Sequence, residues 1–212
     1  VFAVGRAQTL LHAIAQLKAQ GRIPAHLPVY LDSPMAVSAT QLFGEHMGAH
    51  RLTRAELEAM ARGTTLVHTA EESKALARLH GPRVILSASG MATGGRVLHH
   101  LALHAGHHRN LILLTGYQTP GTRGARLAAG EKTLRMLGQE VSIRAQVEQL
   151  QSASAHADAE QLLAWLQKVQ PAPALVFVTH GDMGASDALR QRIEHGLRWR
   201  AQVPRAGASY TV

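Results

Sequence analysis

Hydrophobic residues along the chain change repeatedly between the spacing typical of helices and the short continuous runs typical of buried strands. Between residues 3 and 20, Leu10, Ile14 and Leu17 recur at helical spacing, and Gly21 ends the pattern. Strands are expected at residues 29–31, 64–68, 83–87 and 111–114, and further helices at residues 34–47, 53–60, 71–80 and 96–105. Strands that alternate with helices across short connections predict an α/β fold with a mostly parallel sheet.

The pattern changes after Gly130, where two strand-like runs follow each other without a helix between them. Residues 133–137 and 141–145 flank Gly138 and Gln139, which predicts an antiparallel ribbon. The alternating order then returns, with a helix at 159–169, a strand at 175–179, a helix at 185–197 and a short strand near Val203. We therefore place a domain boundary close to residue 146, which gives domains at residues 1–146 and 147–212.

The composition narrows the class of protein. The chain has 212 residues, of which 46% are hydrophobic, so it can bury a substantial core. It has no cysteine, which excludes disulfides and thiolate metal sites and fits a reducing cytoplasm. No apolar run is long enough to cross a membrane. The formal charge of +8 and the excess of Arg over Lys suit phosphate ligands, although codon bias in a GC-rich genome explains that excess equally well.

One predicted strand leads into a loop of small residues. The loop between the strand at 83–87 and Arg96 contains Gly90, Gly94 and Gly95. Backbone amides in such a loop can point at an anion, and Arg96 would add positive charge. The loop lacks the Lys-Ser/Thr ending of a P-loop and the glycine spacing of a dinucleotide-binding fingerprint. Taken alone, it is read equally well as a phosphate-binding loop or as a tight turn.

Two histidines stand where a predicted strand gives way to a predicted helix. His156 precedes the helix at 159–169, and His180 follows the strand at 175–179. Ligands of open α/β sheets bind at the carboxyl ends of the strands, so both histidines are candidates for one phosphate-cleaving centre. The competing interpretation is structural, because a single histidine before a helix is more often structural than catalytic, and Asp158 is most often a helix N-cap.

Three further polar features have structural interpretations. Asp32 ends the strand at 29–31 and could bind a ligand, but a turn residue is the better interpretation. His99 and His100 are neighbours, as are His107 and His108, and neighbours on a helix point in different directions. We expect both pairs on the surface or at helix ends.

Six motifs are spread over nearly the whole chain. They are Phe2-Ala3-Val4-Gly5-Arg6-Ala7-Gln8, Tyr30-Leu31-Asp32-Ser33-Pro34-Met35-Ala36, Ser87-Ala88-Ser89-Gly90-Met91 with Gly94-Gly95-Arg96, Gly116-Tyr117-Gln118, Ser154-Ala155-His156-Ala157-Asp158, and His180-Gly181-Asp182. In this order they resemble the β-CASP nucleases of the metallo-β-lactamase superfamily. The likeness is greatest to the bacterial and archaeal RNA-processing exo/endonucleases related to the mRNA 3′-end cleavage endonuclease.

The resemblance implies a parallel-sheet β-CASP domain, followed by a segment that completes a metallo-β-lactamase αββα fold from about residue 146. It places His156 on the family's motif B, the proposed general acid or transition-state partner, and His180 on motif C, a ligand of the second zinc ion. DNA-repair relatives typically lack histidine at motif C, so His180 favours an RNA-acting branch. The residues implied in holding RNA phosphates are Ser154, Ser87, Ser89, Gly94 and Gly95, with Arg6 and Arg96 neutralising backbone charge.

The chain also departs from the family pattern. Gln151-Ser152-Ala153 stand where the family usually has glycines, and Asp182 stands where it usually has Glu. The family's His-x-His-x-Asp-His motif, its further metal ligands and its motif A precede this region and have no counterpart here. Because the sequence opens at Val1 without Met, we expect a fragment that is inactive alone and that holds few of the ligands of two zinc ions.

The resemblance therefore predicts a zinc-dependent RNA phosphodiester hydrolase, a ribonuclease of RNA processing or decay, of which this chain is the C-terminal part. Its expected partners are RNA and an N-terminal metallo-β-lactamase half, with a homodimer left open and no membrane. A catalytically inactive RNA-binding relative and a DNA-acting member are the alternatives within the family. An unrelated α/β anion-binding module would require all six motifs to be coincidence.

Overall fold

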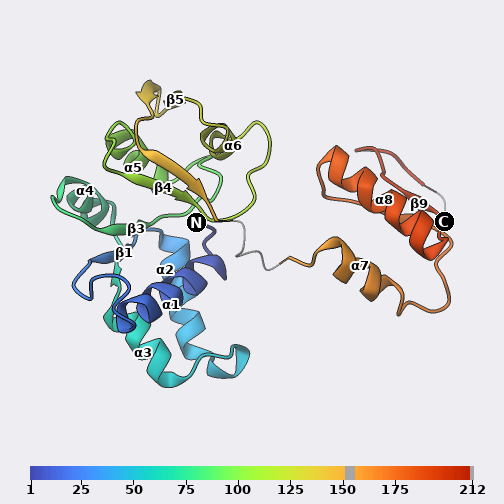
Figure 1. The fold of residues 1–212 in the computed structure, drawn as a ribbon, viewed down its shortest axis with the longest axis horizontal. Coiled ribbons are helices and arrows are strands. Elements are labelled where there is room, and N and C mark those ends of the chain that lie inside the picture. Colours follow the sequence, from blue (N-terminus) through green and yellow to red (C-terminus); the bar gives the residue numbers. More distant parts are fainter. Residues whose placement is uncertain (151–155, 211–212) are drawn as a thin grey trace. The chain divides into compact units, whose positions relative to one another are not determined.

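The structure is a computed structural model that describes residues 1–150 and 156–210 (Figure 1). The chain divides into two compact units, Val1–Ser154 and Ala155–Val212. These units are defined by compactness, whereas the boundary expected near residue 146 separates two domains of the family, so that boundary stays a prediction. The paired strands of the sheet regions are parallel except in one ribbon, which confirms the predicted α/β fold.

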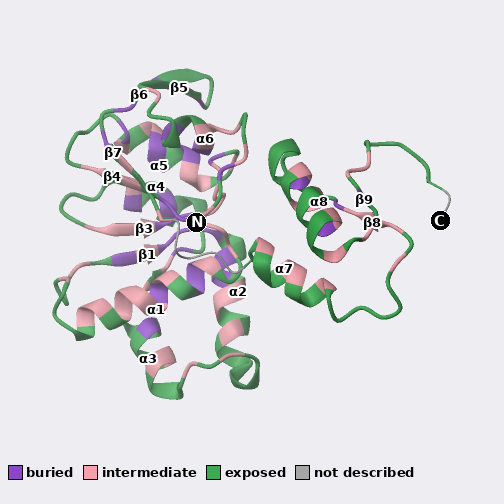
Figure 2. Cartoon of the chain, turned by 45° about the vertical axis from the view of Figure 1, so that its right-hand side comes forward, coloured by how far each residue is buried: buried purple, intermediate pink, exposed green. Residues whose placement is uncertain are grey.

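The first part of unit 1 is a three-stranded parallel sheet with helices around it. The strands are β1 (Val29–Leu31), β2 (Thr65–Leu66) and β3 (Val84–Leu86), in the order β2-β1-β3. The helices are α1 (Arg6–Ala19), α2 (Pro34–Glu45), α3 (Arg54–Arg62) and α4 (Ala70–Arg78), with a short 3₁₀ turn, η1, at Met47–Ala49. Apolar side chains of β1, β3 and the first three helices form one core. Figure 2 shows buried residues along β1 and on one side of α1.

Two helices of this region begin where local sequence signals place them. Ser33 caps α2, because its Oγ accepts a hydrogen bond from the amide of Ala36 at 3.3 Å, and Pro34 takes the first helical position. Thr53 and Glu56 form the capping box of α3, in which the Thr53 amide donates to the Glu56 carboxylate at 2.8 Å. Both predicted helix starts are therefore confirmed.

The second part of unit 1 packs around another apolar core. It contains α5 (Arg96–His104), β4 (Leu111–Leu114), α6 (Arg123–Ala128), β5 (Thr133–Met136), β6 (Gln139–Ser142) and β7 (Gln146–Gln149). β5 and β6 form the predicted antiparallel ribbon, in which Met136 pairs with Gln139 across a turn at Leu137 and Gly138 that has positive φ at both residues. β4 pairs in parallel with β7.

Two elements of this part were absent from the sequence prediction. α6 begins within a turn-rich stretch, where Thr122 accepts a hydrogen bond from the amide of Ala125 at 3.2 Å and so caps a short helix. β7 has the sequence Gln-Val-Glu-Gln, which carries no apolar run. Its partner β4 supplies the pairing, so β7 depends on tertiary context rather than on local propensity.

Unit 2 consists of α7 (Ala159–Leu166), β8 (Val176–Phe177), α8 (Met183–Leu197) and β9 (Ala201–Gln202). β8 and β9 pair in parallel, and Val178, Ile193 and Ala201 form a small core against which Leu163 packs. None of the helices in the described residues is both long and apolar enough to span a bilayer.

Candidate functional site at the carboxyl ends of the strands

Two adjacent parallel strands deliver polar residues to the same edge of the sheet in unit 1. β1 and β3 are paired with Leu31 opposite Leu86, so Asp32 and Ser87 follow side by side. The Asp32 amide donates to the carbonyl of Leu86 at 2.8 Å, and the Ser87 hydroxyl donates to the carbonyl of Asp32 at 2.9 Å. Ser87 is itself buried. Its hydroxyl bonds backbone carbonyls of the protein, and these bonds fix the start of the loop that follows β3.

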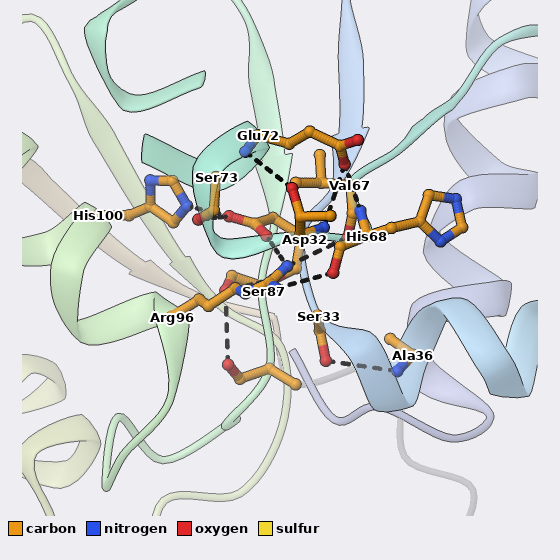
Figure 3. A network of polar contacts seen from close by, with 12 residues as sticks. Asp32, Ser33, Ala36, Val67, His68, Glu72, Ser73, Ser87, Arg96 and His100 are labelled. Carbon is orange, nitrogen blue, oxygen red and sulfur yellow. Dashed lines mark hydrogen bonds and ion pairs between the residues drawn. The ribbon is translucent and has the colours of Figure 1, made fainter. Parts of the chain in front are cut away.

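The Asp32 side chain is the centre of a buried polar network (Figure 3). Its carboxylate is fully buried and accepts hydrogen bonds from the Ser73 hydroxyl at 2.6 Å, from Arg96 Nη1 at 2.8 Å and from His100 Nε2 at 2.6 Å. Burial alone would raise the pKa of Asp32, but the bonds from His100, Ser73 and Arg96 hold that pKa below its ordinary value. The carboxylate is therefore charged, and it ties α4 and α5 to the end of β1.

Arg96 belongs to the same network. Its guanidinium donates to Asp32, to the carbonyl of Val67 at 3.1 Å and to the carbonyl of His68 at 2.9 Å. The side chain is 19% exposed. Arg96 therefore joins the first residue of α5 to the segment after β2, and its predicted contact with a phosphate stays a prediction.

The prediction that His100 lies on the surface or at a helix end is wrong. His100 is only 7% exposed, and its ring contacts the Asp32 carboxylate. The spacing that indicates this role is not that of His99 and His100 but that of Arg96 and His100. These two residues are four positions apart and therefore share one face of α5. His99, which points elsewhere on the helix, is exposed as predicted.

The loop between β3 and α5 is held by short contacts of its own. The hydroxyls of Ser89 and Thr93 lie 2.8 Å apart, and Gly95 occupies the position before α5 with φ 75°, where no side chain caps the helix. A Cβ atom at Gly94 would meet nothing within 4 Å. Backbone at Gly94 can therefore be approached closely by a ligand, whereas a Cβ atom at Gly95 would lie 3.4 Å from the carbonyl oxygen of Ala88.

The Phe2 ring packs between this loop and the segment that follows β4. Its ring lies so close to Gly90 and Gly116 that a Cβ atom at either glycine would come within 2.9 Å of the ring.

Arg6, the first residue of α1, has a buried Nη1 atom with no hydrogen-bond partner among the described residues. A buried unpaired donor is costly, so this atom is suited to a ligand oxygen. Ser154 lies outside the described residues.

The two candidate histidines of unit 2 lie at the starts of its two helices. His180 follows β8 with a left-handed φ of 62° and is exposed. His156 is also exposed and precedes Asp158, which caps α7 by accepting from the Gln161 amide at 2.8 Å, as predicted. The Arg192 guanidinium donates to the Glu160 carboxylate at 2.6 Å, and this ion pair joins the start of α7 to α8.

A centre shared by His156 and His180 stays a prediction. Within residues 1–150 and 156–210, no three His, Asp or Glu side chains form a group that could hold a metal ion. A single imidazole such as that of His180 is an incomplete ligand set for zinc, which takes four ligands in most sites. The residues described here do not make a zinc site by themselves.

Parallel strands, with a glycine-rich loop fixed at their carboxyl ends, define an α/β protein of the kind that binds its ligands at that edge of the sheet. Residues 7–127 match the family model of the β-CASP domain, and residues 140–204 match that of the Zn-dependent metallo-hydrolase RNA specificity domain. The first match spans more than half of the chain, and the chain thus belongs to the β-CASP family of the metallo-β-lactamase superfamily, which confirms the resemblance seen in its motifs.

Curated proteins of several lineages are similar to the chain. Ribonuclease TTHA0252 of Thermus thermophilus is 40% identical over 85% of this chain and 42% of its own length. Transcription termination factor FttA of Methanosarcina mazei is 31% identical over 93% of this chain and 32% of its own length. Integrator complex subunit 11 of Gallus gallus is 26% identical over 100% of this chain and 35% of its own length. The chain thus spans less than half the length of these relatives.

Proposed function

We propose that this chain forms the RNA-binding part of a metal-dependent ribonuclease that hydrolyses phosphodiester bonds in RNA processing or decay. The observation that carries the proposal is the loop from Ser87 to Gly95, which the Asp32 network fixes at the carboxyl edge of a parallel sheet. The match to an RNA specificity domain and the similarity to a protein named as a ribonuclease support RNA as the substrate. A cytoplasmic location and a homodimer stay predictions.

The geometry divides the predicted phosphate-binding residues into two groups. Ser89, Gly94 and Gly95 offer a hydroxyl and accessible backbone to an RNA phosphate, and Arg6 offers a buried donor that has no partner among the described residues. Ser87 and Arg96 hold the loop from behind through bonds to Asp32. Such a preorganised loop binds an anion without first having to be ordered, which strengthens binding.

The catalytic part of the proposal concerns His156 and His180. His180 would be a ligand of one of two zinc ions, whose remaining ligands come from outside the described residues. His156 would donate a proton to the leaving oxygen, since imidazole exchanges protons near neutral pH. A general acid placed in this way typically contributes about 10²–10⁴ to the rate.

Substitution of each histidine in the complete protein tests these roles. His156→Ala should lower kcat for RNA cleavage by about 10²–10⁴ with unchanged zinc content, whereas His180→Ala should lower the zinc stoichiometry itself. His107→Ala, at another exposed histidine, is the matched control and should change neither. Normal turnover of His156→Ala would refute its role, and full zinc content in His180→Ala would refute ligation. RNA binding without any cleavage by the unsubstituted protein would instead favour the inactive relative.

A further inference from the structure

A pocket of about 380 Å³ lies between α6, β5 and the loop that precedes α5. Arginine side chains dominate its lining. α6 contributes Arg123 and Arg126, and β5 contributes Arg135. The remaining lining residues are Thr93, Gly121 and Thr122.

The three guanidinium groups are only partly neutralised. Arg126 forms a two-pronged ion pair with Glu131, with a shortest N–O distance of 2.6 Å. Among the described residues, no carboxylate lies within 4.0 Å of the Arg123 or Arg135 guanidinium, although Glu140 stands opposite Arg135 in the ribbon. One carboxylate against three guanidinium groups leaves the pocket with an excess of positive charge.

One of these side chains is already held in place. Arg123 Nε donates to the carbonyl of Arg135 at 2.7 Å, so a side chain of α6 is anchored on β5. The amide of Gly124 donates to the carbonyl of Met91 at 2.9 Å, which fixes α6 to the loop before α5. The pocket therefore does not have to be assembled by its ligand, and less conformational entropy is lost on binding.

We propose that this arginine pocket binds a phosphate group of the RNA backbone. Guanidinium groups present planar pairs of N–H donors that match phosphate oxygens. Thr93 lines the pocket and also belongs to the loop that carries Gly94 and Gly95, so the two phosphate-binding features are continuous in the chain. The inference rests on the proposed function, because it takes RNA as the ligand.

The test is the affinity of the complete protein for a fluorescent single-stranded RNA that resists cleavage through 2′-O-methyl groups, measured by anisotropy at several salt concentrations. Arg135→Gln removes a positive charge from the pocket, and Glu131→Gln removes its negative charge. Arg54→Gln and Glu58→Gln on α3 are the matched controls, since they make the same changes of charge at exposed positions outside the pocket.

Arg135→Gln should weaken binding by about two- to fivefold and flatten the dependence of log affinity on log salt by about 0.7, the value for one phosphate contact on a single strand. Glu131→Gln should strengthen binding, and both controls should leave it near that of the unsubstituted protein. Inorganic phosphate should compete only at far higher concentration than RNA. If it competed equally well, the pocket would be a free-phosphate site and the assignment to RNA would be overturned.

Two failures are distinguishable. If the unsubstituted protein does not bind the RNA, the proposed function fails and the inference fails with it. If it binds the RNA but Arg135→Gln and Arg54→Gln have equal effects, the pocket makes no specific contact and the inference alone is overturned. An absence of any gain from Glu131→Gln would contradict the inference in the same way.

Discussion

Unit 1 contains two arginine sites that use the same side chain in opposite ways. At the carboxyl end of β1, Arg96 meets a fully buried carboxylate and two carbonyls, so its charge and its donors are matched inside the protein. In the pocket between α6 and β5, Arg135 is exposed and has no carboxylate within 4.0 Å among the described residues. The first arrangement holds the fold together, and the second leaves donors available to an anion.

This difference follows from the cost of burying charge. A buried ion pair is retained only when its remaining polar atoms also find partners, and removal of one member then leaves an uncompensated charge. An exposed arginine has water as its alternative partner and contributes little to folding. The same change of residue should therefore affect stability at one site and ligand binding at the other.

Of the substitutions that test this difference, removal of the Asp32 carboxylate should change the free energy of unfolding most. Asp32→Ala leaves Arg96 and His100 without their shared acceptor and should lower the free energy of unfolding by about 3–5 kcal/mol. Urea unfolding followed by circular dichroism measures the change. Asp182→Ala is the control, because Asp182 also follows a strand but is exposed and makes no side-chain cap. Equal effects of the two substitutions would contradict the assigned role of Asp32.

Arg96→Gln should have the next largest effect. The substitution removes donors to Asp32, Val67 and His68, and loss of hydrogen bonds to a charged group and to partly buried carbonyls should lower the free energy of unfolding by about 1–3 kcal/mol. Arg96→Lys should recover only part of the loss, since an ammonium cannot reproduce the fork of a guanidinium. Full recovery with Lys would show that charge alone, rather than this geometry, stabilises the network.

The pH dependence of stability gives a smaller effect on the same helix. Burial lowers the pKa of His104 below its ordinary 6.5, and the neighbouring charges of His100, Arg83 and His107 act in the same direction. Because the folded state disfavours protonated His104, its contribution to stability is complete above about pH 6.5 and is lost as the pH falls through the lowered value.

We therefore expect the free energy of unfolding to fall between pH 7.5 and pH 5, and to fall less in His104→Gln. The control is His99→Gln, since His99 lies on the exposed side of the same helix and should leave the pH dependence unchanged. An identical pH dependence in His104→Gln and the unsubstituted protein would exclude His104 as its source.

The sequence predicted those features that are encoded locally. Ser33, Thr53 and Asp158 each cap a helix through a partner three residues away, and such short-range signals were read correctly. In the network around Asp32, the three side chains that bond its carboxylate lie far from it in the sequence, at separations of 41, 64 and 68 positions. No local pattern encodes such contacts. For that reason Asp32 was interpreted as a turn residue and His100 as a surface residue.

The roles of His156 and His180 came from the resemblance rather than from spacing or periodicity. The family matches confirm the resemblance itself, but no contact among the described residues tests either role. Their chemistry depends on ligands that the described residues do not supply, whereas the Asp32 network and the arginine pocket are complete within unit 1. This is why the sharpest tests of structure concern unit 1.

Arg135→Gln should have the smallest effect on stability. It compares the two arginine sites directly, because the same substitution is made at Arg96. The exposed side chain makes no ion pair within 4.0 Å in the described part of the chain, so the free energy of unfolding should stay within about 0.5 kcal/mol of the original value. The measurement is the urea unfolding used for Arg96→Gln, which makes the same substitution at the buried site. A loss of more than about 1 kcal/mol would mean that the pocket arginine supports the fold, and the contrast between the two sites would then disappear.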